Sequence, residues 1–466
     1  MPKQNFTCET QVIKIPPPEQ NLAEGSVIKK LVMYAMPLVA GNLLQALYGM
    51  ADMIIAGQII GDTALSAINN ASQITMLITN IALGLSLGGS ILIGQYFGAR
   101  NNKAMNEVAG TLFSLMIILG IFTSILLFTF GRSILMLLGA PSLDDATAYL
   151  NICAIGMVSI FGYNALSAIL RAIGNSRQPF YFIAVAAILN ILLDILFMGT
   201  FSMGTPGAAL ATIVAQTVAF ATALAYVLCS SEILTFSLEN LRIRRTILLQ
   251  ILRYGIPTMM QSIIASLSWL TVTSLINSYG MVISAGNGIS IKVKEFCQLF
   301  TIAMASAATA IVAQNLGAGL FDRARKVTIS AIKISMFMSI ILIVLVELFA
   351  PQLARIFTPD DAVIAAAVLN LRIEIIGQIF YAQFLVYHAL AVGAGHTWFA
   401  MTSSFINCIL FRVILAISLN RFFGLPGLYL ACATAPSISV LLGWLYMRSN
   451  IWRRSLVKVV DTVETR

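Results

Sequence analysis

The chain has 466 residues, of which 59% are hydrophobic and only 10% are charged, and its formal net charge is +9. A soluble globular protein carries about 25% charged residues, so this composition excludes an ordinary soluble domain. Apolar runs of about 20 residues, each long enough to cross the hydrocarbon core of a bilayer, recur along the whole sequence.

The apolar runs predict an all-α polytopic membrane protein with twelve transmembrane helices. A β-barrel is excluded because barrel strands alternate apolar and polar residues, and these runs do not. The first 30 residues are polar, lack the apolar core of a signal peptide and are expected to form a tail. The predicted spans, in chain order, cover residues 33–55, 68–95, 108–130, 148–170, 180–199, 207–229, 255–278, 288–313, 328–350, 366–392, 398–419 and 427–447.

Short motifs of the first half recur in the second half at a nearly constant offset of about 220 residues, which indicates an internal repeat. The clearest pairs are YAMP (34–37) with YGIP (254–257), QYFGA (95–99) with QNLGA (314–318), and MGTPG (203–207) with FGLPG (423–427). Six spans per copy return the chain to the same side, so the copies have parallel topology, as in many transporters.

The repeat predicts two six-helix lobes around a central cavity. The expected parts are an N-terminal tail (1–30), an N-lobe (31–235), a linker (236–252), a C-lobe (253–447) and a C-terminal tail (448–466).

Most of the 28 lysines and arginines lie in the tails and in the loops on one side of the predicted spans. Only Arg132, Arg355 and Arg421 fall in loops on the other side. Because basic loops stay in the cytoplasm, this bias places both termini there. The positive charge is therefore a topology signal, with some attraction to anionic membrane lipid, and we expect no nucleic-acid partner.

The sequence lacks the motifs of a membrane-embedded enzyme. Its six cysteines form no CxxC pair, and its two histidines form no metal-binding cluster with them. No GxxxxGK[ST] loop for ATP is present. We therefore expect no enzyme activity, no cofactor and no metal beyond a coupling ion.

Two carboxylates of the first half lie within predicted spans, where an ionisable group costs about 2.5–3.5 kcal/mol or more. Asp52 and Asp194 each come five residues before the expected outer boundary of a span, and Thr212 comes five residues after one. All three should therefore lie about 7–8 Å below the surface. Asn190 precedes Asp194 by four residues and shares its helix face. Such oxygens can bind Na⁺, or the two acids can share one proton.

The second half does not repeat the acids, because Val272 and Cys432 stand at the positions equivalent to Asp52 and Thr212. Arg412 lies near the position equivalent to Asp194. A purely structural acid pair would more readily be duplicated, so the asymmetry favours ion coupling in the first half.

The chain resembles a MATE (multidrug and toxic compound extrusion) transporter over residues 31–447. The resemblance rests on PLVAGNLLQALYGMADMIIAG (37–57), GQYFGAR (94–100), LRAIGNSRQP (170–179), LNILLDILF (189–197), GTPGAALAT (204–212) and AQNLGAG (313–319). It implies two six-helix lobes and export driven by sodium or proton flow. It also implies that Asp52, Asn190, Asp194, Thr212 and Tyr149 form the cation site.

The second half departs from the pattern of those family members that carry acids in the seventh and tenth spans. Here Gln261 and Gln383 stand in these spans, and with Lys292 and Arg412 they are candidates for lining the cavity. The intramembrane lysines and arginines keep one alternative open, a flippase for lipid-linked precursors, which needs a cationic cavity. Structural ion pairs are the other role we consider for these charges.

The sequence thus predicts a secondary active exporter in the bacterial inner (plasma) membrane. It would work as a monomer by alternating access, as a Na⁺ or H⁺ antiporter. Its cargo would be small amphipathic organic compounds, often cationic, and it would confer antibiotic resistance. Neither the coupling ion nor the identity of the cargo follows from the sequence.

Overall fold

The structure is a computed structural model that describes residues 21–60, 62–137, 142–230, 234, 240–454 and 456–457. Parts of the predicted tails and linker, residues 1–20, 235–239, 455 and 458–466, lie outside this range. The described residues form helices and no strands, and they include 12 helical segments long and apolar enough to cross a membrane. The predicted all-α architecture with twelve spans is confirmed.

The first six spans form one bundle, which we call the N-lobe. It consists of α1 (Val27–Ile59), α2 (Asp62–Gly98), α3 (Asn102–Leu137), α4 (Leu143–Ala172), α5 (Arg177–Asp194) with its π-helical continuation η1 (Ile195–Thr200), and α6 (Thr205–Ser230). Successive spans run in opposite directions. We call the end where α1 begins the tail end, and the opposite end, where α1 finishes, the far end.

The last six spans form the second bundle, the C-lobe, and its final three spans are interrupted. The regular spans are α7 (Arg245–Asn277), α8 (Met281–Gly317) and α9 (Phe321–Arg355). The tenth span consists of α10 (Asp361–Glu374), the 3₁₀ turn η2 (Ile375–Gly377) and α11 (Gln378–Gly393). The eleventh span consists of α12 (Thr397–Phe405), the π-helix η3 (Ile406–Val413) and α13 (Ile414–Phe423). The twelfth span consists of α14 (Leu425–Thr434) and α15 (Pro436–Ser449).

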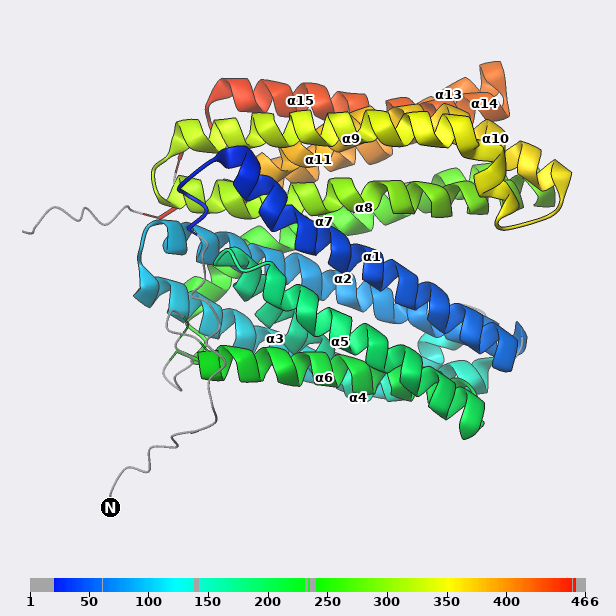
Figure 1. The fold of residues 1–466 in the computed structure, drawn as a ribbon, viewed down its shortest axis with the longest axis horizontal. Helices are drawn as coiled ribbons and strands as arrows, with labels where there is room; N and C mark the ends of the chain where they lie inside the picture. The colour runs from blue at the N-terminus through cyan, green and yellow to red at the C-terminus, as the bar shows by residue number, and fades with distance from the viewer. Residues whose placement is uncertain are drawn as a thin grey trace, which may run out of the picture.

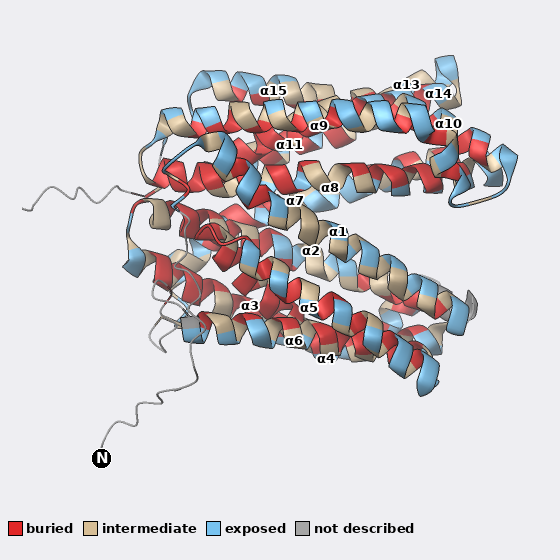
Figure 2. Cartoon of the chain, viewed as in Figure 1, coloured by how far each residue is buried: buried red, intermediate tan, exposed pale blue. Residues whose placement is uncertain are grey.

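The outer faces of both lobes are apolar and exposed. Figure 2 shows exposed residues along the outward sides of the helices and buried residues between them. On α3 and α9 the exposed positions include Phe122, Phe128, Phe337 and Leu348, each at least 60% exposed. Apolar surface of this extent on a soluble protein would cause association, so these faces are covered by lipid. The chain is an integral membrane protein.

The two lobes lie side by side, approach each other at the tail end and diverge toward the far end (Figure 1). In the tail halves of the spans, α2 packs closely against α7 and α8. Gly88 of α2 faces Gly255 of α7, and a Cβ on Gly88 would lie 2.5 Å from the Gly255 nitrogen. Small residues let helix backbones approach in this way.

The repeated QxxGA motifs meet at this junction. A Cβ on Gly98 would collide with the carbonyl oxygen of Gln314, and a Cβ on Gly317 would collide with that of Gln95. Each motif therefore supplies the glycine that admits the backbone of the other. We call this contact of α2 with α8 the tail seam.

The glutamines of the two motifs also bind across the tail seam. Gln95 Nε2 donates to the carbonyl oxygen of Gly393 in the C-lobe at 2.9 Å, and Gln314 Nε2 donates to that of Ala172 in the N-lobe at 2.8 Å. Their side-chain oxygens accept from the chain's ends: Gln314 from the Leu22 amide, Gln95 from the Leu456 amide. The internal repeat is thus visible as a pair of equivalent contacts.

Candidate functional site

The two acids singled out in the sequence come together in the far half of the N-lobe. Asp52 lies on α1, and Asp194 is the last residue of α5 before the π-helical turn. Their carboxyl groups are close enough to share a hydrogen bond when one of them is protonated. Asp194 is completely buried. We call these two residues the acid pair.

Among the described residues, no lysine or arginine forms an ion pair with either acid. One oxygen of Asp52 and both oxygens of Asp194 are buried without a hydrogen-bond partner. Asn190, one turn before Asp194, has both amide atoms buried and unpartnered as well. Buried charge of one sign is very costly, so this group of oxygens needs a proton or a cation.

The Tyr149 side chain of α4 lies beside the acid pair. It is buried, accepts a 3.4 Å hydrogen bond from Ser72, and its hydroxyl is within electrostatic range of Asp52. Sequence reasoning missed two further neighbours of Asp52, namely Tyr48 and Cys153. Tyr48 precedes Asp52 by four residues, so the helical spacing could have placed it on the same face.

The fourth predicted residue, Thr212, lies on α6 at a small cavity. Its hydroxyl donates to the Ala208 carbonyl of its own helix at 3.1 Å, which leaves the oxygen lone pairs available. Thr212 lines a cavity of about 10 Å³ together with Asn190, Tyr48 and Gln216. A cavity of this size has about the room that one water molecule needs.

The equivalent region of the C-lobe has a different charge. Val272 and Cys432 stand at the positions of Asp52 and Thr212. Lys294 of α8 and Glu374 of α10 form a buried ion pair, and the Lys294 nitrogen lies 5.2 Å from the centre of the Trp269 ring. Arg412 lies in the π-helix η3, and the Cys432 thiol of α14 is within electrostatic range of Arg412, Lys294 and Glu374.

Two further cations of the C-lobe spans, Lys292 and Arg372, also have carboxylate partners. Lys292 binds Glu295 at 3.0 Å on an exposed face of α8, and Arg372 of α10 lies 3.7 Å from Glu347 of α9. Three of these four cations thus have a carboxylate partner, and their role as structural ion pairs stays a prediction. The pairing of Lys294 across two helices could not be read from sequence spacing.

The two glutamines predicted to line the cavity, Gln261 and Gln383, form hydrogen bonds within the C-lobe. Gln261 of α7 hydrogen-bonds the buried His388 ring of α11 at 3.0 Å, and Gln383 turns its amide back to the Ile379 carbonyl of its own helix. His388 is accordingly a hydrogen-bonded interior histidine.

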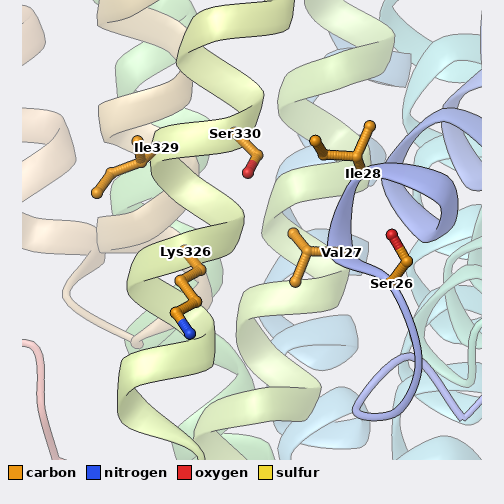
Figure 3. A pocket seen from close by; sticks show the side chains of 6 residues that line it. All are labelled: Ser26, Val27, Ile28, Lys326, Ile329 and Ser330. Atoms are coloured by element: carbon orange, nitrogen blue, oxygen red, sulfur yellow. The ribbon is translucent and has the colours of Figure 1, made fainter.

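A larger hollow of about 280 Å³ lies at the tail end, between the start of α1 and α9 (Figure 3). It is far along the bundle from the acid pair and holds none of the candidate residues. Its lining consists of Ser26, Val27, Ile28, Lys326, Ile329 and Ser330.

Comparison with known proteins shows a family match in both lobes. Residues 37–196 and 257–418 each match the MatE family. The first stretch contains the acid pair and the second contains the Lys294–Glu374 pair, so the family pattern spans both regions described above.

Curated relatives and solved structures match over nearly the whole chain. The probable multidrug resistance proteins YoeA and YpnP of Bacillus subtilis (strain 168) are 26% and 28% identical, over 94% and 93% of this chain and 97% of each relative. A solved structure described as the outward-facing conformation of a multidrug resistance MATE family transporter of the MOP superfamily matches with a TM-score of 0.87 and 24% identity. It covers 92% of this chain and 97% of that chain.

Proposed function

The chain belongs to the MatE family, and from this premise we propose that it is a secondary active exporter of small organic compounds, driven by the inward flow of Na⁺ or H⁺. The observation that carries the proposal is the acid pair, in which a buried carboxylate, Asp194, and a half-buried one, Asp52, have no cationic partner among the described residues. A buried site of this charge is stable only with a bound cation or a shared proton.

The divergence of the lobes supports a passage that opens at the far end. Exposed polar side chains occur on the far halves of α2 and α8, among them Asn69, Gln73, Lys292 and Glu295. Polar residues of membrane helices face the bundle interior or a water-filled cavity, because lipid would not solvate them. We propose that this is the central path of the cargo and that the tail seam closes it on the opposite side.

We place the tail end in the cytoplasm of a bacterial cell, with the protein in the plasma (inner) membrane. The support is the cluster of basic residues at that end, including Arg100, Lys103, Arg171 and Arg177. In this orientation the acid pair is reached from outside, where sodium or protons are supplied.

Coupling would follow from the helices that hold the acid pair. Asp52 is on α1 and Asp194 is on α5, so a proton or Na⁺ between them removes their repulsion and draws the two helices together. The ion can drive the cycle only to the extent that it binds one conformation better than the other. We propose that ion binding disfavours the cargo-loaded, outward-open state and that release inside resets the protein.

The proposed cargo draws on the names of the relatives. YoeA and YpnP are named probable multidrug resistance proteins, so we propose that this chain exports small organic compounds. That the compounds are amphipathic and often cationic, and that the protein works as a monomer, are further proposals. A flippase is less favoured, because three of the four intramembrane cations that it would need are neutralised by carboxylates.

The test is substrate counterflow in proteoliposomes under separately imposed sodium and pH gradients. Wild-type protein should accumulate a cationic dye with one of the two gradients. Asp52→Asn with Asp194→Asn should abolish that dependence, whereas Asp144→Asn, which neutralises an exposed acid of the same lobe, should not. Efflux unaffected by neutralising both acids would refute the coupling proposal.

A further inference from the structure

Arg412, unlike Lys292, Lys294 and Arg372, has no partner of opposite charge among the described residues. Arg412 makes no ion pair and no hydrogen bond among the described residues, and its Nε is buried. An unpaired cation within a membrane bundle is costly and points to a functional role. Its side chain lies near Tyr381 of α11 and Cys432 of α14, so it is directed into the lobe.

The charges around Cys432, a neighbour of Arg412, sum to one positive charge. The Cys432 thiol lies within electrostatic range of Glu374, Arg412 and Lys294, which gathers these three groups around it. Because Lys294 is neutralised by its ion pair with Glu374, Arg412 supplies the excess. The site is therefore suited to one monovalent anion and not to a diphosphate.

Two further buried polar side chains of the C-lobe are also unsatisfied. Asn407 is 1% exposed, and neither atom of its amide has a partner. It precedes Arg412 by five residues, one turn of the π-helix η3. The second oxygen of Glu374 is buried without a partner as well. Buried polar groups in native proteins are nearly always satisfied, so a missing ligand accounts for this cluster.

We propose that Arg412, with Asn407 one π-helical turn before it, binds a carboxylate of the exported compound. The planar guanidinium suits a carboxylate because two parallel hydrogen bonds can form. The preferred cargo would then be amphipathic compounds that carry an acidic group, including zwitterions. This inference rests on the proposed export function and refines its substrate class.

The experiment uses two dyes that differ only at a carboxyl group. Rhodamine 110 has a free carboxylate, and rhodamine 123 is its methyl ester. Purified full-length protein is reconstituted in proteoliposomes, each dye is supplied separately, and the initial rates of transport of the two dyes are compared. Arg412→Gln should lower transport of rhodamine 110 about tenfold or more and leave rhodamine 123 within twofold. Arg372→Gln, which removes a paired cation of the same lobe, should change neither.

A second variant tests the site without removing Arg412. Cys432→Asp places a carboxylate among the same charges, where it would occupy the position proposed for the cargo. It should also selectively lower transport of rhodamine 110. Thermal unfolding in detergent provides a further measurement: Arg412→Gln should not lower the midpoint, because it removes an uncompensated charge.

Equal loss of both dyes in Arg412→Gln, or no loss of either, would overturn the proposal. So would wild-type protein that transports rhodamine 123 and not rhodamine 110. These outcomes leave the export function intact. Wild-type protein that transports neither dye under either ion gradient would count against the export function itself.

Discussion

The two lobes share one helical framework and differ in the charge they hold in their far halves. In the N-lobe, Asp52 and Asp194 bring together two acids with no cation. In the C-lobe, Lys294 and Glu374 form an ion pair, and Arg412 is a further cation near Cys432. Under the two proposals above, duplication kept the scaffold while the halves diverged in chemistry, one toward a positive ligand and the other toward a negative one.

The lobes also differ in regularity. The fifth and eleventh spans are counterparts, and both contain a π-helical segment, η1 after Asp194 and η3 around Arg412. π-Helical turns are frequent at functional sites because they expose backbone groups and re-aim side chains. The tenth and twelfth spans are interrupted in addition, and a Cβ on Gly377 in η2 would lie 2.5 Å from the Ala433 oxygen. The C-lobe therefore has more places where a helix can bend.

The largest effect is expected from neutralising the acid pair. Asp52→Asn with Asp194→Asn removes two charged ligands worth about 1.5–3 kcal/mol each, so ion-driven efflux should fall about a hundredfold or more. Counterflow under sodium and pH gradients measures it. A matched change in the C-lobe, Glu295→Gln, should leave ion dependence unchanged. If it abolished ion dependence too, coupling would not be confined to the N-lobe.

Removing a charge should have opposite effects on protein stability at the Lys294–Glu374 pair and at the acid pair. Lys294→Met leaves Glu374 buried without its partner and should cost about 3–5 kcal/mol, and Lys294→Met with Glu374→Leu should recover most of that loss. Asp194→Asn removes like-charge repulsion and should not lower stability. Thermal unfolding in detergent compares them. An Asp194→Asn midpoint as low as that of Lys294→Met would contradict the assignment of the acid pair to function.

The tail seam should be disturbed to a similar extent by an added methyl group on either of its two glycines. Gly98→Ala and Gly317→Ala each place a Cβ against the backbone of the other lobe, and overpacking of this kind costs about 1–3 kcal/mol. Both variants should therefore lower the initial rate of efflux by a similar factor. Gly49→Ala on α1, where nothing lies within 4 Å of the added Cβ, is the control. Unequal losses would show that the two QxxGA motifs are not functional counterparts.

The smallest effect is expected at Thr212. Thr212→Val removes one oxygen ligand and keeps the side-chain shape, so the apparent affinity for the coupling ion should fall only a few-fold, for about 1 kcal/mol. Thr222→Val alters a hydroxyl on the same helix that bonds only its own backbone and should have no effect. The ion concentration giving half-maximal efflux measures both. Identical curves for Thr212→Val and wild type would remove Thr212 from the site.

The spans and the placement of the acid pair could be predicted from the sequence. Apolar runs determine where helices cross, and counting from Gly57 and Gly199 put Asp52 and Asp194 at the same depth. The packing of α1 against α5, which brings the two acids together, is consistent with that depth but does not follow from it. Helix partners are set by packing of many side chains, and no short-range spacing encodes them.

The C-lobe was harder to predict for the same reason. Lys294 and Glu374 lie 80 residues apart, and their pairing depends on how α8 packs against α10. The nearer candidates, such as Glu295, have a helical spacing that suits Lys292 instead. The π-helical turn around Arg412 could not be predicted from the sequence either. In a span that is apolar on most of its faces, an extra residue in one turn does not visibly change the pattern of apolar residues.

Two backbone amides near the termini, those of Leu22 and Leu456, donate hydrogen bonds to the glutamines that join the lobes, Gln314 and Gln95. When the lobes part at this side to admit cargo, at least one of these anchors has to release or travel with its lobe. A pair of spectroscopic labels placed just before Leu22 and just after Leu456 would therefore report each turnover as a change in separation, without any label touching the passage itself.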